Sequence, residues 1–262
     1  MNLVELLIEF TNKGRYEVFK SLYKENKRHS QLEKELGIPG PEISRNLKRL
    51  CKKELIKKVG DKYEITSTGK IFYQVLIILE LSLKHKDFFN NHEIDAIPIE
   101  LILKLGTLST VNITGQTMKN VQIWSDLVKN SERFIMGISD QFQDSIIPIL
   151  EKKINNLSLE IRALVEGKLL FDSVKVGQQF EDRHAFYEKI DAFRNVRVLD
   201  RAQISLLVTE KGSILFLSKD GAIDYSQCLF DTQESFINWT IELFESYWIK
   251  GKDLKSFIKK EK

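Results

Sequence analysis

The chain has 262 residues, of which 42% are hydrophobic and 29% are charged, an ordinary composition for a globular protein that excludes long disorder. Four prolines and 13 glycines exclude fibrous and linker-dominated architectures. The formal net charge of +3 implies no partner by itself, and the length favours two domains.

The charge is distributed unevenly. Residues 11–75 carry 16 basic and 8 acidic side chains, whereas the rest of the chain carries 24 and 29. This asymmetry predicts an anion-binding module joined to a mildly acidic domain. Two cysteines form no disulfide framework, no signal peptide is recognisable, and the apolar run 71–83 is too short for a bilayer. We therefore expect a cytoplasmic protein with no membrane partner.

Short helices are predicted first along the chain. Apolar residues at helical spacing, 18–23, predict the first helix. Ser30 is expected to cap a helix over residues 30–36, with Glu33 reaching back in a capping box. Gly37 fits a left-handed stop at its end, and Pro41 suits the first position of the next helix.

That next helix, over residues 42–53, has two different faces. Ile43, Leu47 and Leu50 form a buried stripe. The other face presents a hydroxyl group and cations, namely Ser44, Arg45, Lys48 and Lys52, with Arg49 beside them. A helix that enters a DNA major groove needs such a face, because Arg and Lys donate to guanine edges and to phosphates.

A basic hairpin follows this helix. Residues 55–59 and 62–65 alternate around Gly60-Asp61, and Lys57, Lys58 and Lys62 cluster near the turn. Ile43-Ser-Arg-Asn-Leu-Lys-Arg-Leu50, Glu54-Leu-Ile56, Tyr63-Glu-Ile-Thr66 and Gly69 together resemble archaeal and bacterial winged helix-turn-helix regulators.

The resemblance implies a double-stranded DNA partner. In that interpretation Ser44 and Arg45 contact bases, while Lys48, Lys52, Lys58 and Lys62 mainly contact phosphate. Glu42 opens the helix and either accepts from a cytosine amino group or interacts with the helix dipole. The alternative is a solvated basic face used for protein contact.

A long helix is predicted from Gly69 to about Phe89, capped by Thr68. Its apolar residues cover most of the cylinder, so it must be buried on more than one side. We expect it to pack against its copy in a homodimer, with the apolar stretch 1–10 covering the same interface. A helix that only bridges two domains of one chain is the alternative.

Strands and helices alternate after a polar stretch that ends at Pro98. Strands are expected at 111–115, 133–139, 159–165, 196–199, 204–208 and 214–218, and helices at 118–130, 142–154, 181–193 and 232–248, with Pro148 kinking or splitting the second. The fold class is therefore α+β or α/β. We expect a winged helix-turn-helix domain (1–67), a connecting helix (68–92) and a mixed α/β sensor domain (98–262).

The closing segment Phe236–Trp248 resembles archaeal regulators that join a winged helix to an effector domain related to the phospholipase-D fold, including methanogenesis regulators and TrmB-type repressors. Phospholipase-D nucleases need a His-x-Lys motif, and His85, His92 and His184 all lack that spacing. No zinc spacing or phosphate-binding glycine motif is present either. We expect no enzyme activity, no cofactor and no metal.

A sensing role leaves the ends of strands as the candidate pocket. Ser139, Asp140, Glu166 and Arg201 follow strands, where ligands of open α/β sheets bind, although capping or surface ion pairs also explain such residues. Cys51 is a candidate redox switch or a small packing residue. The sequence thus predicts a homodimeric transcription regulator with a small-molecule effector. A ligand-independent architectural protein and a phospholipase-D-related nuclease are the alternatives.

Overall fold

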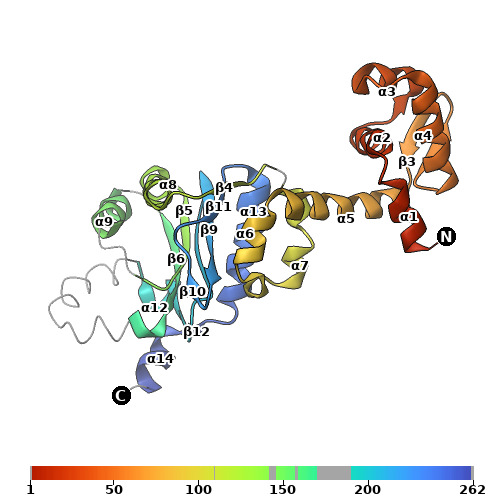
Figure 1. Ribbon diagram of the computed structural model, residues 1–262. Helices are drawn as coiled ribbons and strands as arrows, with labels where there is room; N and C mark the ends of the chain where they lie inside the picture. Colours follow the sequence, from red (N-terminus) through yellow and green to blue (C-terminus); the bar gives the residue numbers. More distant parts are fainter. Residues whose placement is uncertain (1, 109, 142–145, 157–158, 170–189, 261–262) are drawn as a thin grey trace. The chain divides into compact units, whose positions relative to one another are not determined.

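The computed structural model describes residues 2–108, 110–141, 146–156, 159–169 and 190–260. The chain separates into two units, Met1–Glu80 and Leu81–Lys262. Helices dominate the first unit, and a large sheet with helices on both faces forms the second (Figure 1). The predicted mixed α and β fold class is confirmed.

The N-terminal unit has the element order of a winged helix. It contains α1 (Leu3–Glu9), α2 (Lys13–Lys24), β1 (Lys27–Arg28), α3 (His29–Leu36), α4 (Gly40–Lys52), β2 (Ile56–Val59), β3 (Lys62–Ile65) and the first part of α5 (Ser67–Lys84). The predicted hairpin is present as β2 and β3, which pair antiparallel from Ile56↔Ile65 to Val59↔Lys62. Strand β1 adds to the other edge of β3.

One apolar core holds the elements of this unit together. Val18, Phe19 and Leu22 of α2 lie in it with Leu47 and Leu50 of α4, so the predicted buried faces of both helices are confirmed. Burial of one such side chain contributes about 1.5–3 kcal/mol. Tyr73 and Leu76 add the first turns of α5 to the same core.

Two predicted helix caps are wrong. Helix α3 begins one residue before Ser30, and its N-cap is Arg28, whose backbone N–H donates to Gln31 Oε1 (2.8 Å). Strand β1 determines this start, because it holds Arg28 extended against β3. Helix α5 is capped by Thr66, not Thr68, because Thr66 Oγ1 accepts from the Gly69 N–H (3.0 Å). Gly37 ends α3 in the left-handed conformation (φ 64°), as predicted.

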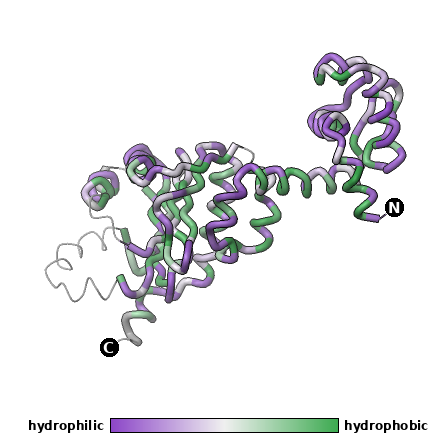
Figure 2. The backbone as a smooth tube through the Cα atoms, viewed as in Figure 1, coloured by the Kyte–Doolittle hydropathy of each residue, from purple (hydrophilic) through white to green (hydrophobic). Residues whose placement is uncertain are grey.

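The long helix is shorter than predicted and is followed by a separate one. Helix α5 ends at Lys84, His85 leaves the helical region (φ −118°, ψ 29°), and α6 (Lys86–Asn91) follows. Apolar residues continue along α5 (Figure 2). Phe72, Tyr73 and Leu76 pack on the N-terminal core, whereas a second set is exposed: Ile71 (70%), Val75 (50%), Leu79 (48%) and Leu83 (72%).

A mixed sheet is the centre of the C-terminal unit. Its strands are β4 (Asn112–Thr114), β5 (Phe134–Ser139), β6 (Glu160–Glu166), β7 (Val196–Leu199), β8 (Ile204–Thr209), β9 (Gly212–Lys219), β10 (Ala222–Ile223), β11 (Cys228–Asp231) and β12 (Lys252–Asp253). The order is β12-β7-β6-β5-β8-β9-β11-β4, with β10 paired to β9. Strands β5, β6 and β7 are parallel, and the pairings of β8, β9, β10, β11 and β12 are antiparallel.

Helices cover both faces of this sheet. One face packs against α13 (Glu234–Trp248), α6 and α7 (Ile99–Ile102), and the other packs against α8 (Thr117–Asn130), α9 (Ile147–Asn156) and α14 (Leu254–Lys260). Trp239 Nε1 of α13 donates to Leu101 O (2.9 Å), and Tyr247 Oη donates to Ala96 O (2.7 Å). These buried polar groups are satisfied by backbone carbonyls of the segment that follows α6.

Several elements differ from the predictions. Pro148 is the second residue of α9 (Ile147–Asn156), so it lies at the start of this helix and does not kink its middle, because a proline in the first turn loses no helical hydrogen bond. Residues 142–145 of the predicted helix lie outside the described residues. Most of the predicted helix 181–193 lies outside the described residues, and Phe193 belongs to the short α12 (Ala192–Asn195). Sequence reasoning missed α7, β10, β11, β12 and α14, of which most are too short to show a periodic pattern.

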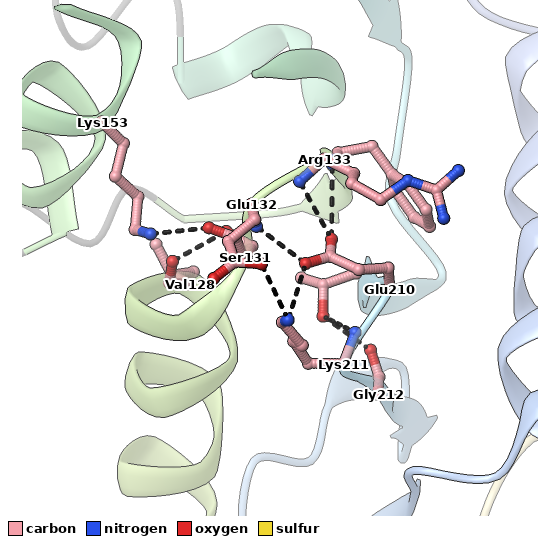
Figure 3. A network of polar contacts seen from close by, with 10 residues as sticks. Val128, Ser131, Glu132, Arg133, Lys153, Glu210, Lys211 and Gly212 are labelled. Atoms are coloured by element: carbon pink, nitrogen blue, oxygen red, sulfur yellow. Dashed lines mark hydrogen bonds and ion pairs between the residues drawn. The ribbon is translucent and has the colours of Figure 1, made fainter. Parts of the chain in front are cut away.

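A largely buried carboxylate fixes the connection between α8 and β5. Glu210 accepts from the backbone N–H groups of Glu132 (2.7 Å), Arg133 (3.3 Å) and Phe134 (3.4 Å), and Lys211 Nζ contacts Glu132 at 3.1 Å (Figure 3). Burial alone would raise the pKa of Glu210, but these N–H groups outweigh it and the pKa lies below its ordinary value. Glu210 therefore stabilises the turn as a carboxylate.

Candidate nucleic-acid interface

Helix α4 separates apolar from cationic residues. Ile43, Leu47 and Leu50 are buried, as the apolar spacing predicted, and Asn46 is buried beside them. The exposed face carries the residues proposed from the sequence, Ser44, Arg45, Lys48 and Lys52. Arg49 and Lys52 lie in the last turn, where cations complement the helix dipole, and Glu42 lies in the first.

A histidine fixes the beginning of this exposed face. His29 Nε2 lies 3.0 Å from Gly40 O and 2.8 Å from Ser44 Oγ. Because a carbonyl oxygen can only accept, the Nε2–H tautomer connects the start of α3 to the first turns of α4. The left-handed Gly37 and this contact set the geometry of the turn between the two helices. Ser44 is thus a positioned hydroxyl group rather than a freely rotating one.

The cations of the exposed face lack acidic partners. Among the described residues, no carboxylate lies within ion-pair distance of Arg45, Lys48 or Lys52. Their positive charge is therefore not neutralised within this unit, and it is directed to solvent. That arrangement suits phosphate and base-edge acceptors.

Arg49 is in a different situation. Its Nε and Nη2 donate to both carboxylate oxygens of the buried Glu9 (2.8 and 2.9 Å), and Arg15 Nη1 donates to the same carboxylate (2.6 Å). The Arg49 hydrogen bonds and the charge of Arg15 hold the pKa of Glu9 below 4.5. Arg49 therefore attaches α1 to α4, and it is the least available of the predicted DNA-contacting cations.

The hairpin carries a second group of free cations. Gly60 forms its turn in the left-handed conformation (φ 61°), a geometry that two-residue turns require. Lys58 and Lys62 are exposed, and no described carboxylate pairs with either. Lys57 instead pairs with Glu64 (2.8 Å). Of the three hairpin lysines, the two chosen as phosphate contacts are the unpaired ones.

Glu42 faces the protein rather than the exposed surface. A Cβ on Gly14 would lie 2.9 Å from Glu42 Oε1, so this carboxylate lies against the first turn of α2. A helix N-terminus attracts negative charge. This geometry favours a structural role for Glu42 over contact with a cytosine.

Two residues near this surface escaped the sequence reasoning. His29 contacts Ser44, and Arg28 pairs with Asp61 at the hairpin turn (2.6 Å). Both belong to the short β1–α3 junction, for which the sequence analysis made no prediction. Lys27-Arg28-His29 is itself a basic run that could have suggested them.

Cys51 lies half-buried on α4. Burial raises the pKa of its thiol, which keeps it protonated near neutral pH. A thiolate is the reactive form in oxidation, so this environment favours the packing role over the redox switch.

The candidate effector residues lie at the carboxyl ends of the parallel strands in the second unit's sheet. This end of β5, β6 and β7 is called the candidate effector edge below. The parallel register pairs Ser139 with Val165 and Glu166 with Leu199, so the carboxyl ends of β5, β6 and β7 meet there. Each candidate already has a partner in the chain. Ser139 Oγ donates to Gln141 O, Asp140 accepts from Tyr225 Oη, Glu166 contacts Lys168 Nζ (3.2 Å), and Arg201 donates to Gly221 O. No hydrogen bond or ion pair between described residues joins two of the four.

Residues 6–82 match the family model of the N-terminal domain of the methanogenesis regulatory protein FilR1. The match takes in α2 to β3 and most of α5. The N-terminal unit is therefore similar to that domain of a regulatory protein. Among curated proteins, none matches the chain.

Solved structures give weaker similarities. The archaeal chromatin protein TrmBL2, described as showing a novel mode of DNA binding, has 15% identity and a TM-score of 0.43 over 93% of this chain and 94% of its own. The dimethyltransferase RosA from Streptomyces davawensis has 13% identity and a TM-score of 0.25 over 75% and 63%. An O-methyltransferase family protein from Burkholderia thailandensis has 10% identity and a TM-score of 0.25 over 78% and 65%.

At these TM-scores the regulatory-domain match is the comparison that bears on function. The relation of the second unit to the phospholipase-D fold stays a prediction. The described residues contain no helix long and apolar enough to cross a membrane. They also contain no group of three His, Cys, Asp or Glu residues that could hold a metal ion.

Proposed function

We propose that the chain is a transcription regulator that binds double-stranded DNA through α4 and the β2–β3 hairpin. The observation that carries the proposal is the set of exposed cations without acidic partners on one helix and the adjacent hairpin: Arg45, Lys48, Lys52, Lys58 and Lys62. The FilR1 N-terminal match supports a regulatory role for the same unit.

The proposed roles within this surface are supported by the positions of its residues. Ser44 and Arg45 lie in the first half of α4, where a recognition helix meets base edges. Lys48, Lys52, Lys58 and Lys62 supply charge to the flanking phosphates. Arg49 contributes by attaching α1 to α4, because its guanidinium is held by Glu9.

Binding measurements with two alanine variants test this division. Genomic footprinting supplies the operator, and binding to operator and random DNA is then measured over a range of salt. Arg45→Ala is expected to lose about 1–3 kcal/mol on the operator and much less on random DNA. Lys58→Ala is expected to weaken both DNAs similarly and to lower the salt slope by about one.

Arg133→Ala is the control, because Arg133 is an exposed arginine of the other unit and belongs to neither proposed site. It should bind the operator like the parent protein. Equal losses on both DNAs for Arg45→Ala would remove its role in reading sequence. A parent protein that shows no salt-dependent binding to either DNA would overturn the whole proposal.

A homodimer is part of the proposed function. Ile71, Val75 and Leu79 of α5 are exposed at four-residue spacing, and α1 of the same unit exposes Leu3 and Ile8. Isolated exposed apolar residues are ordinary, but a stripe along a helix marks an interaction surface. A second copy is the simplest occupant, because a two-fold pair of winged helices reads two half-sites about one helical turn apart.

The second unit is proposed to sense a small-molecule effector. The carboxyl ends of β5, β6 and β7 meet at one edge, as in α/β proteins that bind ligands there. The hydrogen bonds of Asp140 and Arg201 would be the contacts that a ligand rearranges. A thermal-shift screen of metabolites tests this, since a ligand at 100 times its Kd stabilises the fold by about 2.7 kcal/mol.

A further inference from the structure

A cavity lies at the opposite end of the parallel strands from the candidate effector edge. Its volume is about 490 Å³, within the range of small-molecule sites. It is lined by residues of β6, β7, α12 and the end of α13: Glu160, Arg162, Asp191, Arg194, Asn195, Arg197 and Trp248. Three of these seven residues are arginines, and the function proposed above uses none of them.

Two of the arginines are held in place by the end of α13. Arg162 pairs with Glu245, and its guanidinium carbon lies 4.2 Å from the centre of the Trp248 ring. Arg197 Nη1 donates to Trp248 O (2.6 Å), and its guanidinium carbon lies 4.6 Å from the same ring. Cation–π contact and hydrogen bonding thus orient both groups before any ligand arrives.

Two of the three arginines of the cavity have no ion-pair partner among the described residues. Glu245 compensates Arg162, but a backbone carbonyl carries no net charge to compensate Arg197. Arg194 is exposed. Among the described residues, no carboxylate lies within ion-pair distance of Arg194 or Arg197. Two guanidinium groups therefore face one cavity with donors available.

The remaining lining residues restrict the ligand further. A guanidinium fork matches the oxygens of a phosphate or carboxylate group. Glu160 and Asp191 are exposed carboxylates of the same lining, which accept hydrogen bonds from hydroxyl or amino groups. A ligand that fits the whole lining therefore carries hydroxyl or amino groups beside its anionic group.

We propose that this cavity binds a small organic anion, whose phosphate or carboxylate group is held by Arg194 and Arg197. The site goes beyond the proposed function, because it lies at the amino ends of β6 and β7 and needs no DNA. Arg162 and Trp248 position Arg197 and do not themselves make the principal contact. Asn195 is already engaged, since its side-chain amide donates to Ile190 O (2.8 Å).

Calorimetric titration of the full chain tests the site with inorganic phosphate and with citrate, at constant ionic strength set with chloride. Saturable binding of at least one anion with a Kd at or below about 1 mM is expected. Arg194→Gln should weaken that binding at least about tenfold. Its unfolding midpoint should match the parent's, because Arg194 is exposed. Phosphate binding alone would identify a phosphate ester as the ligand class, and citrate binding alone a carboxylate.

The basic N-terminal unit is the competing anion site, so Arg45→Gln is the matched control. The proposal requires that Arg45→Gln keep the anion affinity that Arg194→Gln loses. Absence of saturable binding for both anions overturns it, as does binding that survives Arg194→Gln. DNA binding by the Arg194→Gln variant is measured in parallel, so failure of this site and failure of the DNA-binding proposal give different results.

Discussion

Gly69 lies where the chain at both ends of the β2–β3 hairpin packs closely against the first turn of α5. A Cβ at this position would lie 2.1 Å from the backbone carbonyl oxygen of Leu55 and 2.7 Å from Ile65 Cγ1. Backbone cannot move away as a flexible side chain does, so the elements would have to separate. We expect Gly69→Ala to destabilise the N-terminal unit by at least about 1–3 kcal/mol, the usual cost of overpacking.

Chemical denaturation followed by circular dichroism measures this loss. Gly115→Ala is the matched control, because nothing lies within 4 Å of a Cβ there and its φ is not in the left-handed region. That variant should unfold like the parent protein. If Gly69→Ala also unfolded at the parental denaturant concentration, the close approach of Leu55 to α5 would be wrong.

Glu9 gives the N-terminal unit a specific dependence on pH. The residue is 4% exposed, and its carboxylate receives hydrogen bonds from Arg15 and Arg49. Because these partners lower the pKa of Glu9 below 4.5, its contribution is complete above pH 4.5 and is lost as the pH falls through the lowered pKa. Glu9→Gln leaves Arg15 buried without its counter-charge, so we expect a loss of about 3 kcal/mol at pH 7.

Urea unfolding of Glu9→Gln and the parent, from pH 7 down to about pH 3, checks the prediction. The difference in unfolding free energy should be large at pH 7 and should shrink below pH 4.5. Glu5→Gln is the control, since Glu5 is exposed and its pair with Lys53 (3.6 Å) should contribute less than about 1 kcal/mol. A difference that stayed constant over the whole pH range would contradict the role of the ionised carboxylate.

At the scale of elements, the exposed apolar face of α5 predicts that two copies of the chain form a dimer. Val75 and Leu79 are about half exposed, so a charge at either position disturbs little inside one chain. In a dimer the same carboxylate would be buried without a partner, and burial of an unpaired charge is strongly unfavourable. We expect Val75→Glu and Leu79→Glu to be folded monomers, and to bind a two-half-site operator about 100-fold more weakly.

Sedimentation and operator binding measure the two effects. Lys70→Glu is the matched control, because it introduces the same side chain at an exposed position of α5 outside the stripe. It should remain dimeric. Val75→Glu dimers of parental affinity would show that this face is not the interface.

Sequence periodicity predicted most of the larger described elements because each buries a regular stripe. The Ile43, Leu47 and Leu50 spacing of α4 and the apolar runs of β8 and β9 are signals of this kind. The cap of α3 could not be predicted, because a long-range pairing of Arg28 with β3 overrides the local preference for Ser30. Elements as short as β10 and β12 bury too few residues to leave a pattern.

In the candidate sites, too, features local in the sequence could be predicted, whereas features that depend on long-range contacts could not. The cations of α4 and the hairpin lie on one sequence-local motif, so their exposure could be predicted from the stripe beside them. The restraint of Arg49 depends on Glu9, 40 positions away, and no spacing rule reveals it. The arginine cavity joins β6, β7, α12 and α13, which only the folded sheet brings together.

At the scale of the whole molecule, one loop connects the candidate effector edge to the segment after α6. The loop that follows β9 contacts Asp140 through Tyr225 and Arg201 through Gly221. On its other side, Gly221 N donates to Glu93 Oε1 (2.8 Å), and Asp224 Oδ2 lies 3.3 Å from Nε2 of the buried His92. A ligand that rearranged Asp140 or Arg201 would therefore act on residues 92–93, and α6 immediately precedes them.

Asp224→Asn tests this connection, because it removes the charge that faces His92 and keeps the shape of the side chain. We expect faster amide hydrogen exchange in α6 (Lys86–Asn91) than in the parent protein. The reason is that His92, the buried residue directly after α6, loses its charged partner. Any effector found by the thermal-shift screen should still bind, but its effect on operator affinity should fall toward none, since coupling needs a shared two-state element.

Asp220→Asn is the control. It changes an exposed carboxylate of the same loop and should behave like the parent in both measurements. Unchanged exchange in α6 together with a parental effector response in Asp224→Asn would mean that the signal does not pass through His92.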